Sequence, residues 1–222
     1  MNPSGDDPRF KDARLYAITD LSSEDPAVFK KIESAYAGGV DIVQLRCKNL
    51  DDVALLQLAR QIRAIADREE KIFMMNDRPD LAIACGADGV HLGQGDLSLA
   101  AARELARKSG RHLWVGKSTH SLDQALQAVD EGADYIGVGP IYKTPTKPDY
   151  QAVGLELIRE VKNKVKIPFF AIGGINTSNL TSVLDAGARR IAVVRAVFGS
   201  DSVQNSAATL RRMIDEYGHA HV

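Results

Sequence analysis

Eight short apolar segments, separated by longer helical patterns, most strongly limit the folds open to this chain. Most are continuous apolar runs without polar alternation, which is typical of parallel strands covered on both faces. We therefore predict an α/β fold in which helices cover a parallel sheet. The segments are residues 15–19, 42–45, 72–75, 89–92, 113–116, 135–138, 169–172 and 191–194.

A repeated glycine supports the count of eight. Residues 38–42, 86–90, 132–136 and 187–191 each place a helix-ending glycine before an apolar strand, at spacings of 48, 46 and 55 residues. They precede every second strand, so the repeating unit spans two strand–helix pairs. The 222 residues leave about 28 per unit, enough for a strand, a helix and two short loops. A single (β/α)8 TIM barrel explains this order, and an open doubly wound sheet is the alternative.

The helical patterns complete the predicted domain organisation. Residues 50–68 place Leu55, Leu58, Ile62 and Ile65 on one stripe. Ser121 and Gln124 have the spacing of a capping box at the start of another helix. Weaker patterns cover residues 26–37, 79–85, 99–108, 155–165, 179–186 and 204–217. We expect a flexible N-terminal arm over residues 1–13, one barrel domain over 14–217 and a C-terminal tail over 218–222.

Charge and cysteine content exclude several classes of function. The 28 Lys and Arg residues nearly balance the 29 Asp and Glu residues, which argues against a protein that binds nucleic acid through bulk charge. The two cysteines suit a reducing compartment. No apolar run marks a signal peptide at the start, and the longest uncharged stretch, 167–184, holds too many glycines and polar residues for a membrane span. We expect a cytoplasmic protein without a membrane partner.

Polar and charged residues gather directly after the predicted strands. In a barrel of this kind the active site lies at the C-terminal ends of the strands. No large apolar side chain stands among these residues. They are Asp20, Arg46, Lys48, Asn76, Asp77, Gln94, Asp96, Lys117, Ser118, His120, Thr144, Thr146, Lys147, Gly173, Gly174 and Arg195.

Two sub-sites follow from these positions. After the seventh strand, Gly173 and Gly174 would let backbone N–H groups approach an anion, which predicts a phosphate cup, although such glycines also occur in plain turns. The second sub-site joins two carboxylates and three cations. Two carboxylates suit a Mg²⁺ ion that bridges to a diphosphate, whereas a ring of surface salt bridges is the alternative. Its members are Asp77, Asp96, Arg46, Lys48 and Lys147.

Other catalytic arrangements are absent from the sequence. His91 and His120 have no second His or Cys at zinc-ligand spacing. Ser118 lies two residues from His120 without a G-x-S-x-G turn, so a catalytic triad is not predicted. Trp114 is expected in the core.

The strand ends together resemble the thiamine-phosphate synthase family. The motifs are QLRCK at 44–48, NDR at 76–78, GVHLGQGD at 89–96, GKSTHS at 116–121, GPIYKTPTK at 139–147 and AIGGI at 171–175. They occur in the family's order between about residues 15 and 198. The resemblance implies a cytoplasmic transferase, with a suggested homodimer, that joins a hydroxymethylpyrimidine diphosphate to a hydroxyethylthiazole phosphate with Mg²⁺. It implies that diphosphate leaves to give a pyrimidine carbocation, captured by the thiazole nitrogen without a protein nucleophile.

The resemblance also implies roles for individual residues. Asp77 and Asp96 would bind Mg²⁺, and Arg46, Lys48, Ser118 and Lys147 would be the catalytic groups. The pyrimidine diphosphate would be held by Gln44, Arg46, Lys48, Asn76, Ser118 and Lys147. The thiazole phosphate would be held by Thr144, Pro145, Thr146, Gly174, Val194 and Arg195.

Two positions depart from the family's commonest pattern. Cys47 replaces an acidic residue, and Arg195 stands where many relatives have Ser. Cys47 would be a thiol at the site unless strand alternation buries it. Two other functions remain open: a thiazole tautomerase-like barrel protein, and a non-catalytic binder of thiamine precursors. Asp96 and Lys147 favour the synthase, because a tautomerase would need neither.

Overall fold

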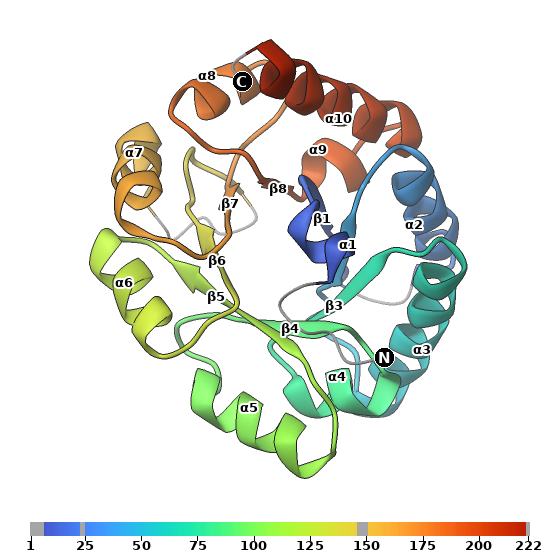
Figure 1. The fold of residues 1–222 in the computed structure, drawn as a ribbon. Helices are drawn as coiled ribbons and strands as arrows, with labels where there is room; N and C mark the ends of the chain where they lie inside the picture. The colour runs from blue at the N-terminus through green and yellow to red at the C-terminus, as the bar shows by residue number, and fades with distance from the viewer. Residues whose placement is uncertain (1–6, 23–24, 146–150, 221–222) are drawn as a thin grey trace.

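The eight predicted strands form a closed barrel. The computed structural model describes residues 7–22, 25–145 and 151–220. All strands are parallel, pair in chain order and close through β8 and β1 (Figure 1). The prediction of a (β/α)8 TIM barrel is confirmed, and the open sheet is excluded. The strands are β1 (Leu15–Ile18), β2 (Ile42–Leu45), β3 (Ile72–Asn76), β4 (Gly89–Leu92), β5 (Trp114–Thr119), β6 (Tyr135–Val138), β7 (Phe169–Ile172) and β8 (Ile191–Val193).

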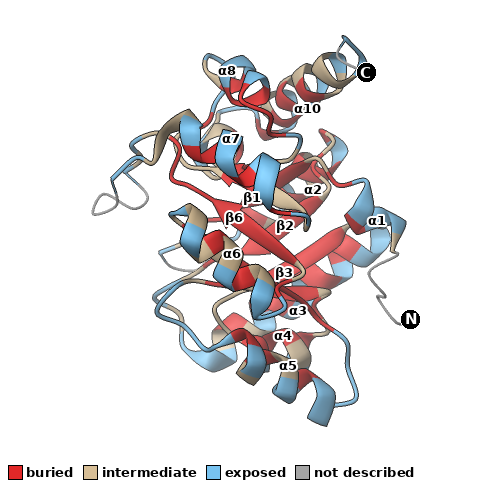
Figure 2. Cartoon of the chain, turned by 60° about the vertical axis from the view of Figure 1, so that its left-hand side comes forward, coloured by how far each residue is buried: buried red, intermediate tan, exposed pale blue. Residues whose placement is uncertain are grey.

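Helices surround the barrel, with their outer faces exposed and the strands buried at the centre (Figure 2). Two four-residue helices, α1 and α9, lie where no helix is predicted, and α10 includes residues 218–220, which we expected as tail. None of the described helices combines the length and apolar character that a membrane span needs. The helices are α1 (Pro8–Lys11), α2 (Val28–Ala37), α3 (Asp52–Arg68), α4 (Pro79–Cys85), α5 (Leu99–Lys108), α6 (Leu122–Asp130), α7 (Gly154–Lys164), α8 (Leu180–Asp185), α9 (Arg195–Phe198) and α10 (Val203–Ala220).

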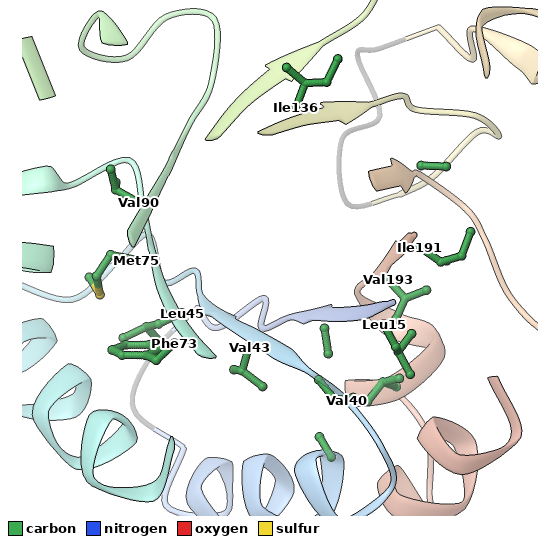
Figure 3. Packing of buried hydrophobic residues seen from close by; sticks show 14 of the residues in the cluster. Leu15, Val40, Val43, Leu45, Phe73, Met75, Val90, Ile136, Ile191 and Val193 are labelled. Carbon is green, nitrogen blue, oxygen red and sulfur yellow. The ribbon is translucent and has the colours of Figure 1, made fainter. Parts of the chain in front are cut away.

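Alternation along the strands divides the apolar side chains into two layers. Val43 and Phe73 belong to the outer cluster between strands and helices, where Figure 3 shows them. Their neighbours Ile42 and Ile72 belong to a separate cluster inside the barrel, as does Trp114, the predicted core residue. Both faces of each strand are therefore buried, which explains the continuous apolar runs in the sequence.

The predicted helix signals appear in the structure. Leu55, Leu58, Ile62 and Ile65 are all buried on α3. At the start of α6, the Ser121 hydroxyl accepts a hydrogen bond from the backbone N–H of residue 124 at 3.2 Å, which satisfies one of the N–H groups that a helix leaves unpaired.

Helix α1 closes the N-terminal end of the barrel. The Phe10 ring is buried, with its centroid 4.7 Å from that of Trp114 and 5.3 Å from that of Tyr135. Asp7 caps the helix through its side chain, which accepts from the backbone N–H of Arg9 at 2.9 Å. From residue 7 onward, the segment expected as a flexible arm is thus helical and packed; residues 1–6 lie outside the described residues.

Three aspartates tie the N-terminal ends of the strands together. Asp41, Asp88 and Asp134 each stand directly before an even-numbered strand, in that order β2, β4 and β6. In that order, their carboxylates accept from the backbone N–H groups of Leu15, Phe73 and Val115, at 3.0, 2.8 and 2.6 Å. Each carboxylate therefore fixes the start of the preceding odd-numbered strand.

A helix-borne arginine pairs with each of these aspartates. Arg211 of α10 lies 2.9 Å from Asp41, Arg103 of α5 lies 3.0 Å from Asp134, and Arg63 of α3 pairs with Asp88. The residue directly before β8 is Arg190 instead, which donates to the Lys11 carbonyl of α1 at 3.0 Å. The glycine repeat thus marks a structural layer at the end of the barrel opposite the predicted site.

Candidate active site

A cavity opens at the C-terminal ends of the strands, where the sequence places the site. Its volume is about 300 Å³. Several βα units contribute, and the residues with polar side chains come mainly from the ends of β2 to β5. Its lining includes Gln44, Arg46, Asn76, His91, Ser118, His120, Thr144, Gly173, Gly174, Asn176, Val194 and Arg195.

The wall formed by β2 carries two predicted residues. Gln44 is 1% exposed and donates through Nε2 to the Tyr16 hydroxyl at 2.6 Å. Arg46 is also buried, and its guanidinium pairs with the Asp20 carboxylate after β1. The pairing with Asp20 fixes the direction of the guanidinium. The sequence places Asp20 among the strand-end residues but did not predict this pairing.

Asn76 and Ser118 line the cavity from neighbouring parts of the sheet. Asn76 ends β3 and donates to the Asp77 carboxylate. The Ser118 Oγ on β5 lies 2.9 Å from His91 Nε2 on β4. The structure thus brings together the Gln44, Arg46, Asn76 and Ser118 positions of the predicted pyrimidine sub-site.

The predicted phosphate cup forms the opposite part of the lining. Gly173 and Gly174 have φ values of 102° and 66°, a region that favours glycine. A Cβ on Gly174 would lie 2.8 Å from Tyr142 Cβ and 2.9 Å from the Lys143 carbonyl oxygen, so the close approach of the two loops requires glycine. Thr144, Val194 and Arg195 also line the cavity. Arg195 additionally borders a second cavity of about 310 Å³ formed with the β1–α2 loop.

Other predicted residues do not line the cavity. Lys48 is exposed beyond β2, and Pro145 is exposed at the edge of the described β6–α7 loop. Thr146 and Lys147 lie outside the described residues. Cys47 is half-buried and packs against the outer apolar cluster, so strand alternation directs this thiol away from the cavity.

The two carboxylates that could hold a divalent cation follow the adjacent strands β3 and β4 and are not part of the cavity lining. Asp77 follows β3, and its backbone N–H donates to the His91 carbonyl on β4 at 2.8 Å. Asp96 lies in the loop after β4, where one oxygen accepts from the Gly93 N–H at 2.7 Å. The φ of Asp77 is 62°, a strained value for a non-glycine residue that is characteristic of functional sites.

The donor set fits Mg²⁺ better than a metal held by protein groups alone. Among the described residues, no group of three or more His, Cys, Asp and Glu side chains converges on one point. Mg²⁺ usually takes one or two carboxylates and completes its octahedron with water and substrate oxygens. Asp77 and Asp96 on adjacent strand ends supply that number of carboxylates.

No role was assigned from the sequence to several polar groups in and below the cavity. His91, Tyr16 and Tyr135 lie inside the barrel, and burial raises the pKa of both tyrosine hydroxyls. His120 lines the cavity, and its Nδ1 contacts the Gly139 carbonyl oxygen. The signal available in the sequence was a polar side chain inside an apolar run, as His91 is in the fourth strand.

The closed barrel and the polar cavity at its strand ends define a (β/α)8-barrel enzyme. A family model described as thiamine monophosphate synthase matches residues 15–197. The chain belongs to this family, whose members are transferases.

Individual relatives agree with this assignment. A thiamine-phosphate synthase of Gloeobacter violaceus is 48% identical over 200 residues, which are 90% of this chain and 57% of that protein. A thiamine-phosphate synthase of Thermus thermophilus is 46% identical over 87% of this chain and 91% of its own length. Among solved structures, a thiamine phosphate pyrophosphorylase from Pyrococcus furiosus has 36% identity and a TM-score of 0.85, covering 95% of this chain and 99% of its own. The chain thus spans little more than half of the Gloeobacter relative.

Proposed function

We propose that this protein is a thiamine-phosphate synthase. It would condense 4-amino-2-methyl-5-hydroxymethylpyrimidine diphosphate with 4-methyl-5-hydroxyethylthiazole phosphate and release diphosphate. The observation that carries the proposal is one cavity lined both by Gly173 and Gly174, where we predict an anion cup, and by the amide of Gln44 and the hydroxyl of Ser118. Each of the two substrates carries a phosphate group and a heteroaromatic ring. The glycines would bind phosphate, and the polar side chains would bind a ring.

The residues of the β2–β5 wall would bind the pyrimidine diphosphate. Gln44 on β2 and Ser118 on β5 line the cavity and would hold the ring. The Arg46 guanidinium would meet the diphosphate, with its direction held by Asp20. Lys48, Thr146 and Lys147 would add contacts from the rim, and the backbone around Gly174, Val194 and Arg195 would hold the thiazole phosphate.

Asp77 and Asp96 would hold Mg²⁺, which when bound offsets the negative charge that develops on a departing diphosphate. The reaction would begin as the C–O bond breaks and diphosphate leaves with the electron pair. The thiazole nitrogen lone pair then forms the new C–N bond to the pyrimidine carbocation. Arg46 would stabilise the leaving group, and the common cavity would keep the thiazole close to the carbocation. No covalent protein intermediate enters this scheme.

Release of diphosphate is the direct test. Purified protein should liberate diphosphate only when both substrates and Mg²⁺ are present, as measured with an enzyme-coupled diphosphate assay. No release from fresh substrates with excess Mg²⁺ would rule out the synthase and leave the tautomerase-like barrel or the non-catalytic binder.

A matched pair of variants tests the metal site. Asp96→Asn removes one negative charge from the loop after β4 and should raise the Mg²⁺ concentration for half-maximal activity at least about tenfold. Asp130→Asn makes the same change at an exposed residue on the last turn of α6 and should leave the titration unchanged. Superimposable Mg²⁺ titrations for Asp96→Asn and the unmodified protein would refute the role of Asp96.

A further inference from the structure

A continuous path of hydrogen bonds crosses the barrel interior beneath the cavity. The Gln44 Nε2 lies 2.6 Å from the Tyr16 hydroxyl, which lies 3.2 Å from the Tyr135 hydroxyl. The Tyr135 hydroxyl is 3.2 Å from His91 Nδ1, and His91 Nε2 is 2.9 Å from the Ser118 Oγ. The path therefore joins β2 to β5, three strands away in the barrel, through side chains of β1, β6 and β4.

Three members of the path line the cavity, and the two tyrosines do not. Gln44, His91 and Ser118 are in the lining, whereas Tyr16 and Tyr135 lie below it and are 2% and 0% exposed. Burial raises the pKa of both phenols, so each remains protonated and offers one proton and an acceptor oxygen. A change at either tyrosine thus reaches the ligand through the three residues that line the cavity.

The Gln44 amide sets the direction at one end of the path. Its nitrogen can only donate, so the Tyr16 oxygen accepts there. In the arrangement that keeps every hydroxyl proton of the tyrosines on the path, Tyr16 donates to Tyr135, and Tyr135 donates to His91 Nδ1. A neutral imidazole that accepts at Nδ1 carries its proton on Nε2, which then donates to the Ser118 Oγ. This arrangement leaves the Ser118 proton and the Gln44 Oε1 for a ligand in the cavity that both residues line.

We propose that Tyr16 and Tyr135 are positioning residues that hold His91 as the Nε2–H tautomer, which makes Ser118 a hydrogen-bond donor and Gln44 an acceptor toward the ligand. This inference rests on the proposed function for its substrate: a heteroaromatic ring bound between these walls must offer an N–H donor to Gln44 and an acceptor to Ser118. An aminopyrimidine carries both, with an exocyclic amine beside a ring nitrogen. The polarity of the path would thus select the amino form of the ring over an oxo analogue.

The tautomer of His91 can be read in the ligand-free protein, independently of activity. In protein labelled with ¹⁵N-histidine, two-bond ¹H–¹⁵N correlation spectra distinguish Nε2–H from Nδ1–H imidazole, and a His91→Gln spectrum assigns the signal among the five histidines. We expect Nε2–H in the unmodified protein near neutral pH. Nδ1–H as the dominant form would overturn the proposal, because it requires the path to run the other way.

Removal of single hydroxyls tests whether the tyrosines set this tautomer. Tyr135→Phe should shift the His91 signals toward a mixture of tautomers. The control is Tyr36→Phe, since Tyr36 is equally buried but donates to the Ile72 carbonyl at 2.9 Å, outside the path. An unchanged His91 signal in Tyr135→Phe would refute the positioning role. If Tyr135→Phe does not fold, Tyr16→Phe replaces it, and the spectrum of the unmodified protein still decides the direction.

Kinetics separate this inference from the proposed function. Tyr16→Phe and Tyr135→Phe should each raise KM for the pyrimidine diphosphate about five- to tenfold. The KM for the thiazole phosphate should stay within about twofold, and Tyr36→Phe should change neither. Failure of the unmodified protein to release diphosphate refutes the proposed function alone. An active unmodified protein with equal KM values in all three variants refutes the inference alone.

Discussion

Removal of Asp88 should destabilise the barrel far more than removal of its counterpart Asp134. Asp88 pairs with Arg63, and the two side chains are 14% and 10% exposed. Asp88 also accepts from the Phe73 N–H at 2.8 Å. In Asp88→Ala, Arg63 would keep an exposed partner, Asp67, a long bond to the Lys71 carbonyl and a contact with the Phe73 ring, while its Nε already lacks a partner among the described residues.

The burial of each ion pair determines how much free energy of unfolding each variant loses. Removing one partner of a buried ion pair costs about 3–5 kcal/mol. The remaining contact of Arg63 with Asp67 offsets part of this cost, whereas the lost bond to the strand β3 backbone adds to it. Asp134 and Arg103 are 27% and 37% exposed, so water replaces much of their interaction. We therefore expect Asp134→Ala to cost about 1–2 kcal/mol, chiefly from the bond to the Val115 N–H.

Urea unfolding followed by circular dichroism and by fluorescence of Trp114, the chain's one tryptophan, measures both losses. Replacing Arg63 as well, in Asp88→Ala with Arg63→Met, should recover at least about 1 kcal/mol, because it removes the buried cation. Equal losses for Asp88→Ala and Asp134→Ala, or a double variant no more stable than Asp88→Ala, would refute the reasoning.

Three further predictions concern other parts of the molecule. Phe10→Ala should cost about 2–3 kcal/mol in urea unfolding, less than a typical core phenylalanine because the short α1 can separate from the barrel; an unchanged unfolding midpoint would contradict its packing role. Gly174→Ala should raise KM for the thiazole phosphate at least about tenfold, whereas Gly218→Ala, where a Cβ meets nothing within 4 Å, should not. The free energy of unfolding should fall above about pH 10, because burial raises the folded-state pKa of Tyr16, Tyr36 and Tyr135 above the unfolded value of 10.0 and the folded state then binds more protons. Tyr36→Phe should reduce that slope, as urea titrations at pH 9 to 11 would detect.

The sequence predicts the strands well because a parallel strand buried on both faces leaves a continuous apolar run. The same property hides the barrel interior. When both faces are apolar, alternation does not tell which side chain points inward, so Tyr16 and Tyr135 carry no sequence signal that separates them from ordinary core residues. His91 could have been found, since it is a polar side chain within such a run. The direction of Cys47 also required the register of β2, which the structure supplies.

Neither the short helices nor the ion pairs between distant residues can be predicted from sequence patterns, and the reasons differ. Helices α1 and α9 have four residues each, which is about one turn and too short to display a 3.6-residue period. The glycine repeat indicates where even-numbered strands begin, but the pairing of Asp88 with Arg63 links residues 25 apart through the closed barrel. For the site, strand ends predict the cavity wall at Gln44, Arg46, Asn76 and Ser118, and the roles of these residues stay predictions.

Helix α1 covers one end of the barrel interior, and the cavity lies at the other end. Phe10 covers Trp114 and Tyr135 from below, so, within the part of the chain that the structure describes, water reaches the two phenols through the cavity at the other end. A ligand seated between Gln44 and Ser118 would close that route as well. The hydroxyl protons of Tyr16 and Tyr135 would then exchange with bulk water only as fast as the ligand leaves. Their exchange rates would therefore report the rate of ligand release.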